Sequence, residues 1–417
     1  MKITKECLNL MSFFLKNNCL LPLKQTNTTD KILTKLYNEL TNGFKYIQKQ
    51  KLMSGEQFYK LNVEYITNIN QIPKPNTFSQ KAFPSKIRKH IDEFSIGLLS
   101  YNLYLFGRNI NILFVIENGN LEKLIKIYNN YVDYMLVLLY IVNIYSSKKC
   151  VKQLKIFIYH TTLLKILPES NISILDEHNV NTAFTRTCPI DSEIVVFRKE
   201  EWFKAFIHET FHNFGLDFSG MNIMKVNEKI ANIFQVNSDV NLFESYSEFW
   251  ARIINIVFCS FTNMKDKNNI NEFLINSEFF INYERVFSFF QMVKILNFMG
   301  LTYNNLYNKD NLSYNLKKTL YKEKSNILSY YIITLILIDN YQDFLLWCNT
   351  NNTELLQFKK TTKNLEKYCN FIESNYKSNR IINGVKCATK LLSMAKLFKK
   401  DLNYLINNLR MTLCELG

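Results

Sequence analysis

The pentapeptide HETFH, residues 208–212, carries two histidines and a glutamate at a spacing that suits metal chemistry. On a helix, His208 and His212 project from one face, one turn apart, and reach the same metal ion. Glu209 lies beside them, near enough to take a proton from a water at the metal. Composition alone predicts about 0.005 such matches in the chain. The motif therefore predicts a zinc site that hydrolyses its substrate with an activated water; a helix with two ordinary histidines is the alternative.

Two imidazoles do not hold a catalytic zinc, so a third protein ligand is required. The extended pattern HExxHxxGxxH would bring a third histidine round after a glycine turn. Gly215 is in place, but position 218 is Phe, Asp217 falls one residue short, and His178 is the only other histidine near in sequence. These departures disfavour that arrangement.

A better source of the third ligand is the downstream segment NLFESYSEFWARI, residues 241–253. Glu244 and Glu248 are four residues apart on a predicted helix whose apolar face would pack against the HETFH helix. The segment is similar to the second helix of gluzincins, in which one glutamate ligates zinc and a later acid orients a ligand histidine. We therefore expect Glu244 to ligate and Glu248 to hydrogen-bond His208. Ligation by Glu248, or a solvated acidic pair, are the alternatives.

The residues around HETFH predict the helix that must carry it. Apolar residues recur at helical spacing through 198–215, Glu200 and Glu201 favour the positive end of the helix, and Gly215 is placed to end it. The preceding segments predict, in order, a β-hairpin at 100–120, a long helix at 120–147, and strands within 151–168, 179–189 and 192–199.

The whole chain is expected to be an α+β protein, predominantly helical, in which a zincin-like core with a small mixed or antiparallel sheet packs on the HExxH helix. The regions expected are a helical N-terminal region (1–95, with a proline-rich loop at 70–85), the core (96–260) and a helical C-terminal lobe (261–417) that includes a final helix at 386–413.

One of the predicted strands is a candidate for binding substrate. Asn181, Ala183 and Phe184 lie in NVNTAFT, about two dozen residues before His208, a position that resembles the substrate-binding edge strand of thermolysin-like enzymes. An extended peptide would add its backbone hydrogen bonds to such an edge. A purely structural strand is an equal alternative.

An oxyanion stabiliser is harder to assign, because peptidases of this type commonly use a Tyr or His and the chain has 24 tyrosines. The candidates are Tyr246, Tyr283, Tyr330 and Tyr331. Cys188 has no partner His at a telling spacing, so it is interpreted as an ordinary thiol.

Composition constrains the partners and the cellular compartment expected for the protein. The net charge of +15 is spread along the chain with Lys far exceeding Arg, which indicates a diffusely basic surface and makes nucleic acid an unexpected partner. Nine scattered cysteines without a CxxC pair predict reduced, mostly buried thiols of a cytosol-like compartment. The most apolar run, within 131–147, is interrupted by Asp133 and Asn143, so no membrane span is expected.

The segments EIVVFRKEEWFKAFIHETFHNFGLDFS, ESYSEFWA and FSFFQMVKILNFMGLTY together resemble a group of HExxH proteins of giant nucleocytoplasmic DNA viruses, over roughly 180–303. This resemblance implies a gluzincin-type core and a host-cytoplasmic or virion setting, with no substrate attached. The first functional hypothesis is a zinc metallopeptidase acting on a polypeptide. The second is a non-catalytic structural or virion-associated protein that retains the fold, and DNA binding is a third.

Overall fold

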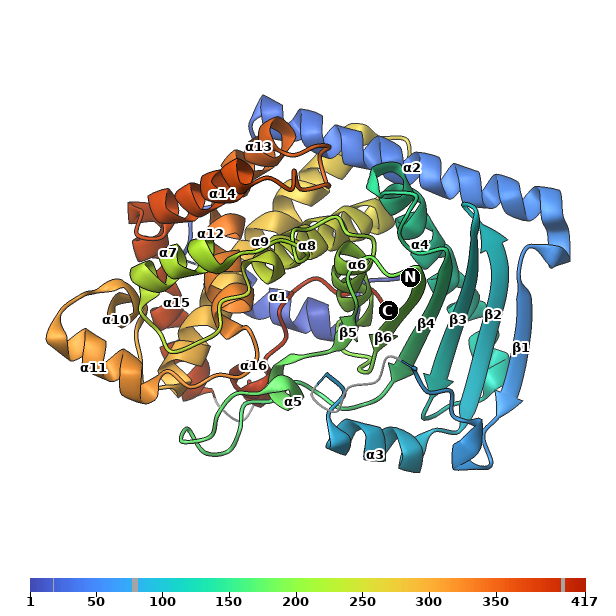
Figure 1. Ribbon diagram of the computed structural model, residues 1–417, viewed down its shortest axis with the longest axis horizontal. Helices are drawn as coiled ribbons and strands as arrows, with labels where there is room; N and C mark the ends of the chain where they lie inside the picture. The colour runs from blue at the N-terminus through green and yellow to red at the C-terminus, as the bar shows by residue number, and fades with distance from the viewer. Residues whose placement is uncertain (18, 77–81, 399–401) are drawn as a thin grey trace.

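The protein is described by a computed structural model that covers residues 1–17, 19–76, 82–398 and 402–417. Helices predominate, and one six-stranded sheet lies at one side of the molecule, with most helices gathered at the other (Figure 1). The expectation of a mainly helical protein with a small mixed sheet is confirmed at this level.

The sheet has the strand order β1-β2-β3-β4-β6-β5, in which β3, β4 and β6 run parallel and the remaining pairs are antiparallel. The strands are β1 (Lys60–Tyr65), β2 (Gly97–Leu105), β3 (Arg108–Ile116), β4 (Gln153–His160), β5 (Ala183–Thr185) and β6 (Asp191–Val196). The expected hairpin is confirmed as β2 and β3, joined at Phe106 and Gly107, whose positive φ angles suit a two-residue hairpin turn. The short strand β5 forms one edge of the sheet.

The helices before the HETFH motif are α1 (Lys5–Asn17), α2 (Asn27–Ser54), α3 (Ser85–Phe94), α4 (Leu121–Tyr145) and α5 (Glu177–Val180), with short turns η1 (Gly55–Gln57) and η2 (Ile69–Gln71). The motif lies in α6 (Trp202–Asn213), followed by α7 (Met224–Phe234), α8 (Leu242–Asn263) and α9 (Ile270–Phe298). The rest are α10 (Tyr303–Tyr307), α11 (Asn311–Leu320), the π-helical η3 (Leu328–Ile333), α12 (Thr334–Asp339), α13 (Tyr341–Asn351), α14 (Thr362–Asn375), α15 (Asn379–Leu397) and α16 (Asn403–Asn407).

The two faces of the sheet are covered differently. On one face the long helix α4, confirmed where it was expected, packs with α6 and joins a hydrophobic core that extends from α1 to the last residues of the chain. On the other face a smaller cluster, including Phe157 and Phe197, is covered by α3 and the segment before it. Because α6 is held between the sheet and α8, its position is fixed from two sides.

Three expectations about chain segments need correction. Residues 60–65 form β1, although the first 95 residues were expected to be helical. The strand in 151–168 ends at His160, well before Pro168. The final helix does not run through 408–413, because that segment is buried and irregular and its N–H groups bond distant carboxylates. The proline-rich loop and the C-terminal segment also include residues outside the described ranges.

The expectation of uniformly reduced cysteines is also wrong for this structure. Disulfides join Cys150 to Cys188 and Cys19 to Cys387, with Cα–Cα distances of 4.8 and 5.6 Å. The partners are 38 and 368 residues apart and meet only through the tertiary fold, so their spacing carries no signal. The other five are buried thiols: Cys7, Cys259, Cys348, Cys369 and Cys414.

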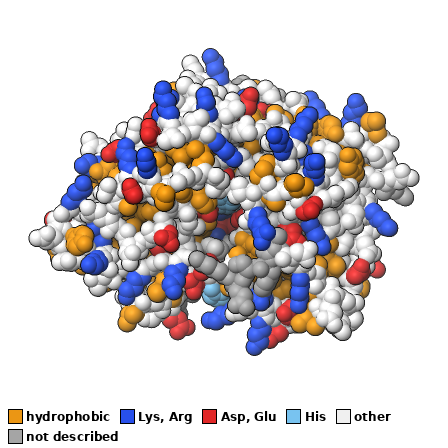
Figure 2. All heavy atoms as spheres, in the orientation of Figure 1, with side chains coloured by type: hydrophobic (Ala, Val, Ile, Leu, Met, Phe, Trp, Pro, Cys, Tyr) orange, Lys and Arg blue, Asp and Glu red, His pale blue; other side chains and the backbone are white. Residues whose placement is uncertain are grey.

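Within the described residues, every helix is too short or too polar to cross a lipid bilayer. On the face shown in Figure 2, Lys and Arg side chains are scattered among acidic ones rather than gathered into one patch.

Candidate metal centre

Helix α6 is buried along its whole length, which is unusual for a helix with this many polar residues. It starts after Glu201, whose φ of 57° is left-handed, and it ends at Asn213, just before Gly215, whose φ of 65° lets the Leu216 N–H turn back and donate to the Phe211 carbonyl at 2.9 Å. The glycine stop is therefore confirmed. Glu200 and Glu201 do not serve the helix start as expected; both carboxylates bind the 404–412 segment of the chain.

Two rings of α6 and one carboxylate of α8 meet at a single point. Nε2 of His208 lies 3.0 Å from Nε2 of His212. Oε2 of Glu244 lies 3.0 Å from Nε2 of His208 and 3.2 Å from Nε2 of His212. Two ligands of a tetrahedral zinc, each about 2.0–2.1 Å from the metal, lie about 3.3 Å apart. The three atoms are therefore spaced nearly as one metal ion would require.

The opposite nitrogen of each ring is held by a buried acid. Nδ1 of His208 lies 3.0 Å from Oε2 of Glu248, and Nδ1 of His212 is in short contact with Oδ2 of Asp217. Asp217 also accepts bonds from the Ser219 N–H and from the hydroxyls of Ser219 and Ser247, so its orientation is fixed.

These contacts decide which ring atoms are free to bind a metal. An ionised carboxylate only accepts hydrogen bonds, so each Nδ1 carries the proton and each neutral ring has its lone pair on Nε2. Both Nε2 lone pairs and the shared oxygen of Glu244 then point at one another, and no Lys or Arg of the described residues is paired with Glu244. Three acceptors converging in this way favour a cation at their centre.

The pKa shifts of the three groups all favour their charged forms. Burial alone would lower the pKa of each ring, but Glu244 and the Nδ1 acids raise the pKa of His208 and, further, that of His212. Burial alone would raise the pKa of Glu244, but the rings of His212 and His208 hold it below its ordinary value. The surroundings thus stabilise positive charge where the three atoms meet.

Glu209 differs from the other acids of the site. Its carboxylate is buried, and no group of the described residues hydrogen-bonds it. Burial raises its pKa to about 6, against the opposing influence of His208 and His212. It lines a narrow pocket of about 30 Å³ that His208 and Tyr330 also line, room for a water molecule. A carboxylate with this pKa in this place suits a general base.

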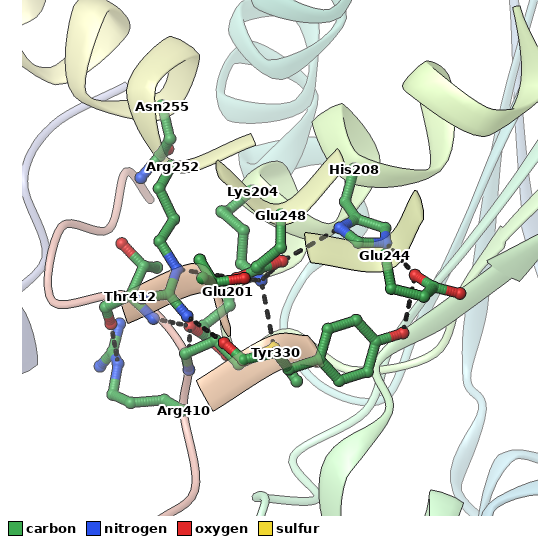
Figure 3. A network of polar contacts seen from close by, with 12 residues as sticks. Glu201, Lys204, His208, Glu244, Glu248, Arg252, Asn255, Tyr330, Arg410 and Thr412 are labelled. Carbon is green, nitrogen blue, oxygen red and sulfur yellow. Dashed lines mark hydrogen bonds and ion pairs between the residues drawn. The ribbon is translucent and has the colours of Figure 1, made fainter. Parts of the chain in front are cut away.

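One tyrosine of the four candidates reaches the centre. The Tyr330 hydroxyl, from η3, donates to Oε2 of Glu244 at 3.1 Å. Figure 3 shows the Tyr330 ring below Glu244 and His208. Burial and the charges of Glu244 and Glu209 raise the pKa of Tyr330 well above its ordinary value, so it keeps its proton. Tyr246 and Tyr331 donate to backbone carbonyls elsewhere, and Tyr283 lies on α9.

Other residues considered from sequence lie away from the centre. His178 lies on α5, and its carbonyl accepts from Arg198. Phe218 packs in an aromatic cluster with Tyr246 and Phe358. Neither occupies a ligand position, and Asp217 contacts His212 from the side opposite Nε2.

The candidate substrate strand is divided between two faces. Asn181 and Ala183 line the pocket that contains Glu209, and Ala183 belongs to the edge strand β5. Phe184 points to the other side of the sheet, where it packs on Phe83 and Phe197. The Thr182 carbonyl accepts a hydrogen bond from the Phe197 N–H, just after β6. Since backbone groups of successive residues point to opposite sides of a strand, the N–H and C=O of Ala183 face away from β6, toward the open edge.

The centre is reached from the protein surface. Figure 2 shows a hollow in the middle of one face, in which acidic and histidine side chains are visible. A second cavity of about 720 Å³ shares Asn181 with the narrow pocket and is lined mainly by polar residues, among them Asn241 and Asn326. This second cavity therefore offers space next to the narrow pocket for a ligand larger than water.

Two contributors to the site were not identified in the sequence. Asp217 was weighed only as a metal ligand, although an acid five residues after the second histidine, just past the glycine turn, is a usable signal for a ring partner. Lys204, one turn before His208, carries no signal of its own, because its role depends on which residue of α8 faces it.

Comparisons with models of known families, with curated proteins and with solved structures found no match. The resemblance to HExxH proteins of giant viruses therefore stays a prediction, and the functional argument depends on the geometry of the site.

Proposed function

We propose that this protein is a zinc-dependent metallopeptidase with a zincin-type core of gluzincin character. The observation that carries the proposal is the convergence of the His208 and His212 Nε2 atoms with Oε2 of Glu244, while both Nδ1 atoms are committed to acids. Two imidazoles and one carboxylate are the donor set of catalytic zinc sites that keep a position open. Zinc, when bound, supplies Lewis-acid activation of water and of the substrate carbonyl.

The residues of this chain then have separate roles. Glu209 takes the proton of the attacking water and delivers it to the leaving amine, for which its unbonded carboxylate is suited. The protonated hydroxyl of Tyr330 donates to the oxygen of the carbonyl as negative charge develops there. The open edge at Ala183 binds the polypeptide as an added strand, with Asn181 beside it.

The alternative is a structural or virion-associated protein that retains the fold, with or without zinc, and cleaves nothing. Bound zinc is compatible with both hypotheses, so its presence does not separate them. The carboxylate of Glu209 separates the two hypotheses. It hydrogen-bonds no group of the described residues, so a purely structural site would give it no role.

The test is to measure zinc content and to incubate the protein with a peptide library, with products read by mass spectrometry. We expect about one zinc per chain, lost in His208→Ala. Glu209→Gln should retain zinc and lower hydrolysis on the order of 10²- to 10⁴-fold. Zinc-loaded protein that cleaves nothing, or Glu209→Gln as active as the unmodified protein, would contradict the peptidase.

A further inference from the structure

A lysine lies beside the metal centre without touching the metal ligands. Lys204 is one turn before His208 on α6, and its side chain is 4% exposed. Its Nζ lies 2.9 Å from Oε1 and 3.0 Å from Oε2 of Glu248, and 3.7 Å from the sulfur of Met411. Figure 3 shows Glu248 held between Lys204 on one side and His208 on the other.

Basic side chains of α6 alternate with acidic side chains of α8 along the contact between the two helices. Lys204, His208 and His212 follow one another at four-residue steps along one face of α6. On α8, Glu248 and Glu244 are also four residues apart, and each contacts two members of that row. Lys204 is thus the first residue of the row on α6 that also carries His208 and His212.

The contacts of Glu248 are divided between its oxygens. Oε1 accepts from Lys204 and from Nε of Arg252 at 2.9 Å, whereas Oε2 accepts from Lys204 and from the His208 ring. Arg252 is also tied to the Ser288 hydroxyl and the Tyr330 carbonyl. Among the described residues, Lys204 is therefore the cation that bridges both oxygens and fixes the rotation of the carboxylate.

We infer that Lys204 is a positioning residue of the metal centre, acting through Glu248 to hold the His208 ring with Nε2 toward the metal. The inference rests on the proposed zinc site. A buried ammonium is costly to desolvate, and well-packed apolar side chains often stabilise a fold at least as well as a buried ion pair. The placement of Lys204 against the acid that orients a ligand therefore gives it a use beyond packing.

A second buried lysine provides a matched control. Lys294, on α9, is 3% exposed and donates to the backbone carbonyls of Leu405 and Asn408. It has the same residue type and burial as Lys204, and both contact the C-terminal part of the chain. Lys294 has no contact with Glu248 or with the ligands, so its loss tests the cost of removing any buried lysine.

The test measures zinc affinity, by competition with a chromophoric chelator, and the urea stability of the metal-free protein. We expect Lys204→Met to weaken zinc binding about 10- to 100-fold. Lys294→Met should lower stability and leave zinc affinity unchanged. Glu248→Gln should weaken zinc binding by a similar factor, and Lys204→Met combined with Glu248→Gln should bind zinc no more weakly than Glu248→Gln alone.

Other results would overturn the inference. Folded Lys204→Met with unchanged zinc affinity, or effects of Lys204→Met and Glu248→Gln that multiply, would show that Lys204 does not act through Glu248. If Lys204→Met does not fold, Lys204→Gln is measured under the same criteria. Unmodified protein that binds no zinc would remove the metal centre and the inference together. Zinc binding without peptide cleavage would refute only the peptidase.

Discussion

Two carboxylates near α6, the buried Glu201 just before it and the partly buried Glu244 on α8, are satisfied in opposite ways. Glu201 has donors on both oxygens: Lys165 Nζ at 2.7 Å on Oε2, and the N–H groups of Met411 and Thr412 at 2.7 and 2.5 Å on Oε1. Glu244 shares one oxygen with the Nε2 atoms of two rings whose other nitrogens are already committed, and its hydrogen-bond donor outside the rings is Tyr330.

The difference separates a structural cluster from the one proposed to be functional. The protein supplies the positive charge at Glu201 itself, so that cluster is complete and ties the C-terminal segment to the start of α6. At Glu244 no Lys or Arg of the described residues is paired with the carboxylate, and in the proposed function a metal ion supplies the charge. A buried polar group that is fully partnered stabilises a fold, whereas acceptors left converging on one point indicate a ligand.

The largest expected effect comes from breaking the complete cluster. Glu201→Ala leaves the Lys165 ammonium buried without its partner and removes the acceptor of two N–H groups, so it should lower the free energy of unfolding by about 3–5 kcal/mol. Urea unfolding of the metal-free protein measures this. Glu244→Ala is the control, with lost zinc binding and a smaller change in stability. Equal losses of stability in both variants would contradict the distinction between the clusters.

A smaller effect is expected at Tyr330, whose hydroxyl reaches the candidate metal centre. If the proposed function is right, Tyr330→Phe should lower kcat about 100-fold, because a donor to the developing oxyanion is lost, while zinc content and KM change little. Steady-state kinetics on a cleaved peptide measures both parameters. Tyr331→Phe is the matched control, since that hydroxyl donates to the Leu409 carbonyl. A Tyr330→Phe variant with full kcat would exclude this role.

The smallest effect concerns a buried imidazole that has no acid beside it. His160 receives its contact at Nδ1 from the Tyr128 hydroxyl at 3.0 Å, and burial lowers its pKa to about 3. The unfolded chain binds a proton near pH 6.5, so stability is full above that pH and falls as the pH drops toward 3. Between pH 7 and pH 5 the loss should be about 2 kcal/mol.

Urea unfolding of the unmodified protein and of His160→Phe at both pH values isolates this contribution. The variant should lose less stability between pH 7 and pH 5 than the unmodified protein does. Equal losses would mean that His160 does not sense pH in the folded state.

The sequence predicted the elements that carry the centre better than the contacts that complete it. The spacing of His208 and His212 needs only a regular helix, so local periodicity was enough to predict how α6 presents both rings. The glycine stop at Gly215 is equally local. The contacts of Glu244 and Glu248 with His208 join two helices, and they were expected from the resemblance of the second helix to that of gluzincins rather than from periodicity.

What the sequence could not reveal depends on long-range contacts. The segment 408–413 has a helical pattern, but its N–H groups bond Glu201 and Glu284, more than a hundred residues earlier in the chain. Strand β1 exists because β2 offers it an edge. The Cys150–Cys188 pair likewise depends on the placement of β6 beside β4. Tertiary partners override local preference in each case.

The short length of β5 affects how a bound polypeptide would be positioned along the edge of the sheet. By the alternation of a strand, the amides and carbonyls of Ala183 and Thr185 face outward, so a guest chain would have a short main-chain anchor near the centre. A guest that slides by two residues presents the same side-chain faces and meets the same anchor. If the proposed function is right, cuts within one flexible stretch would fall at alternate bonds, and the fragments would form a series differing by dipeptides.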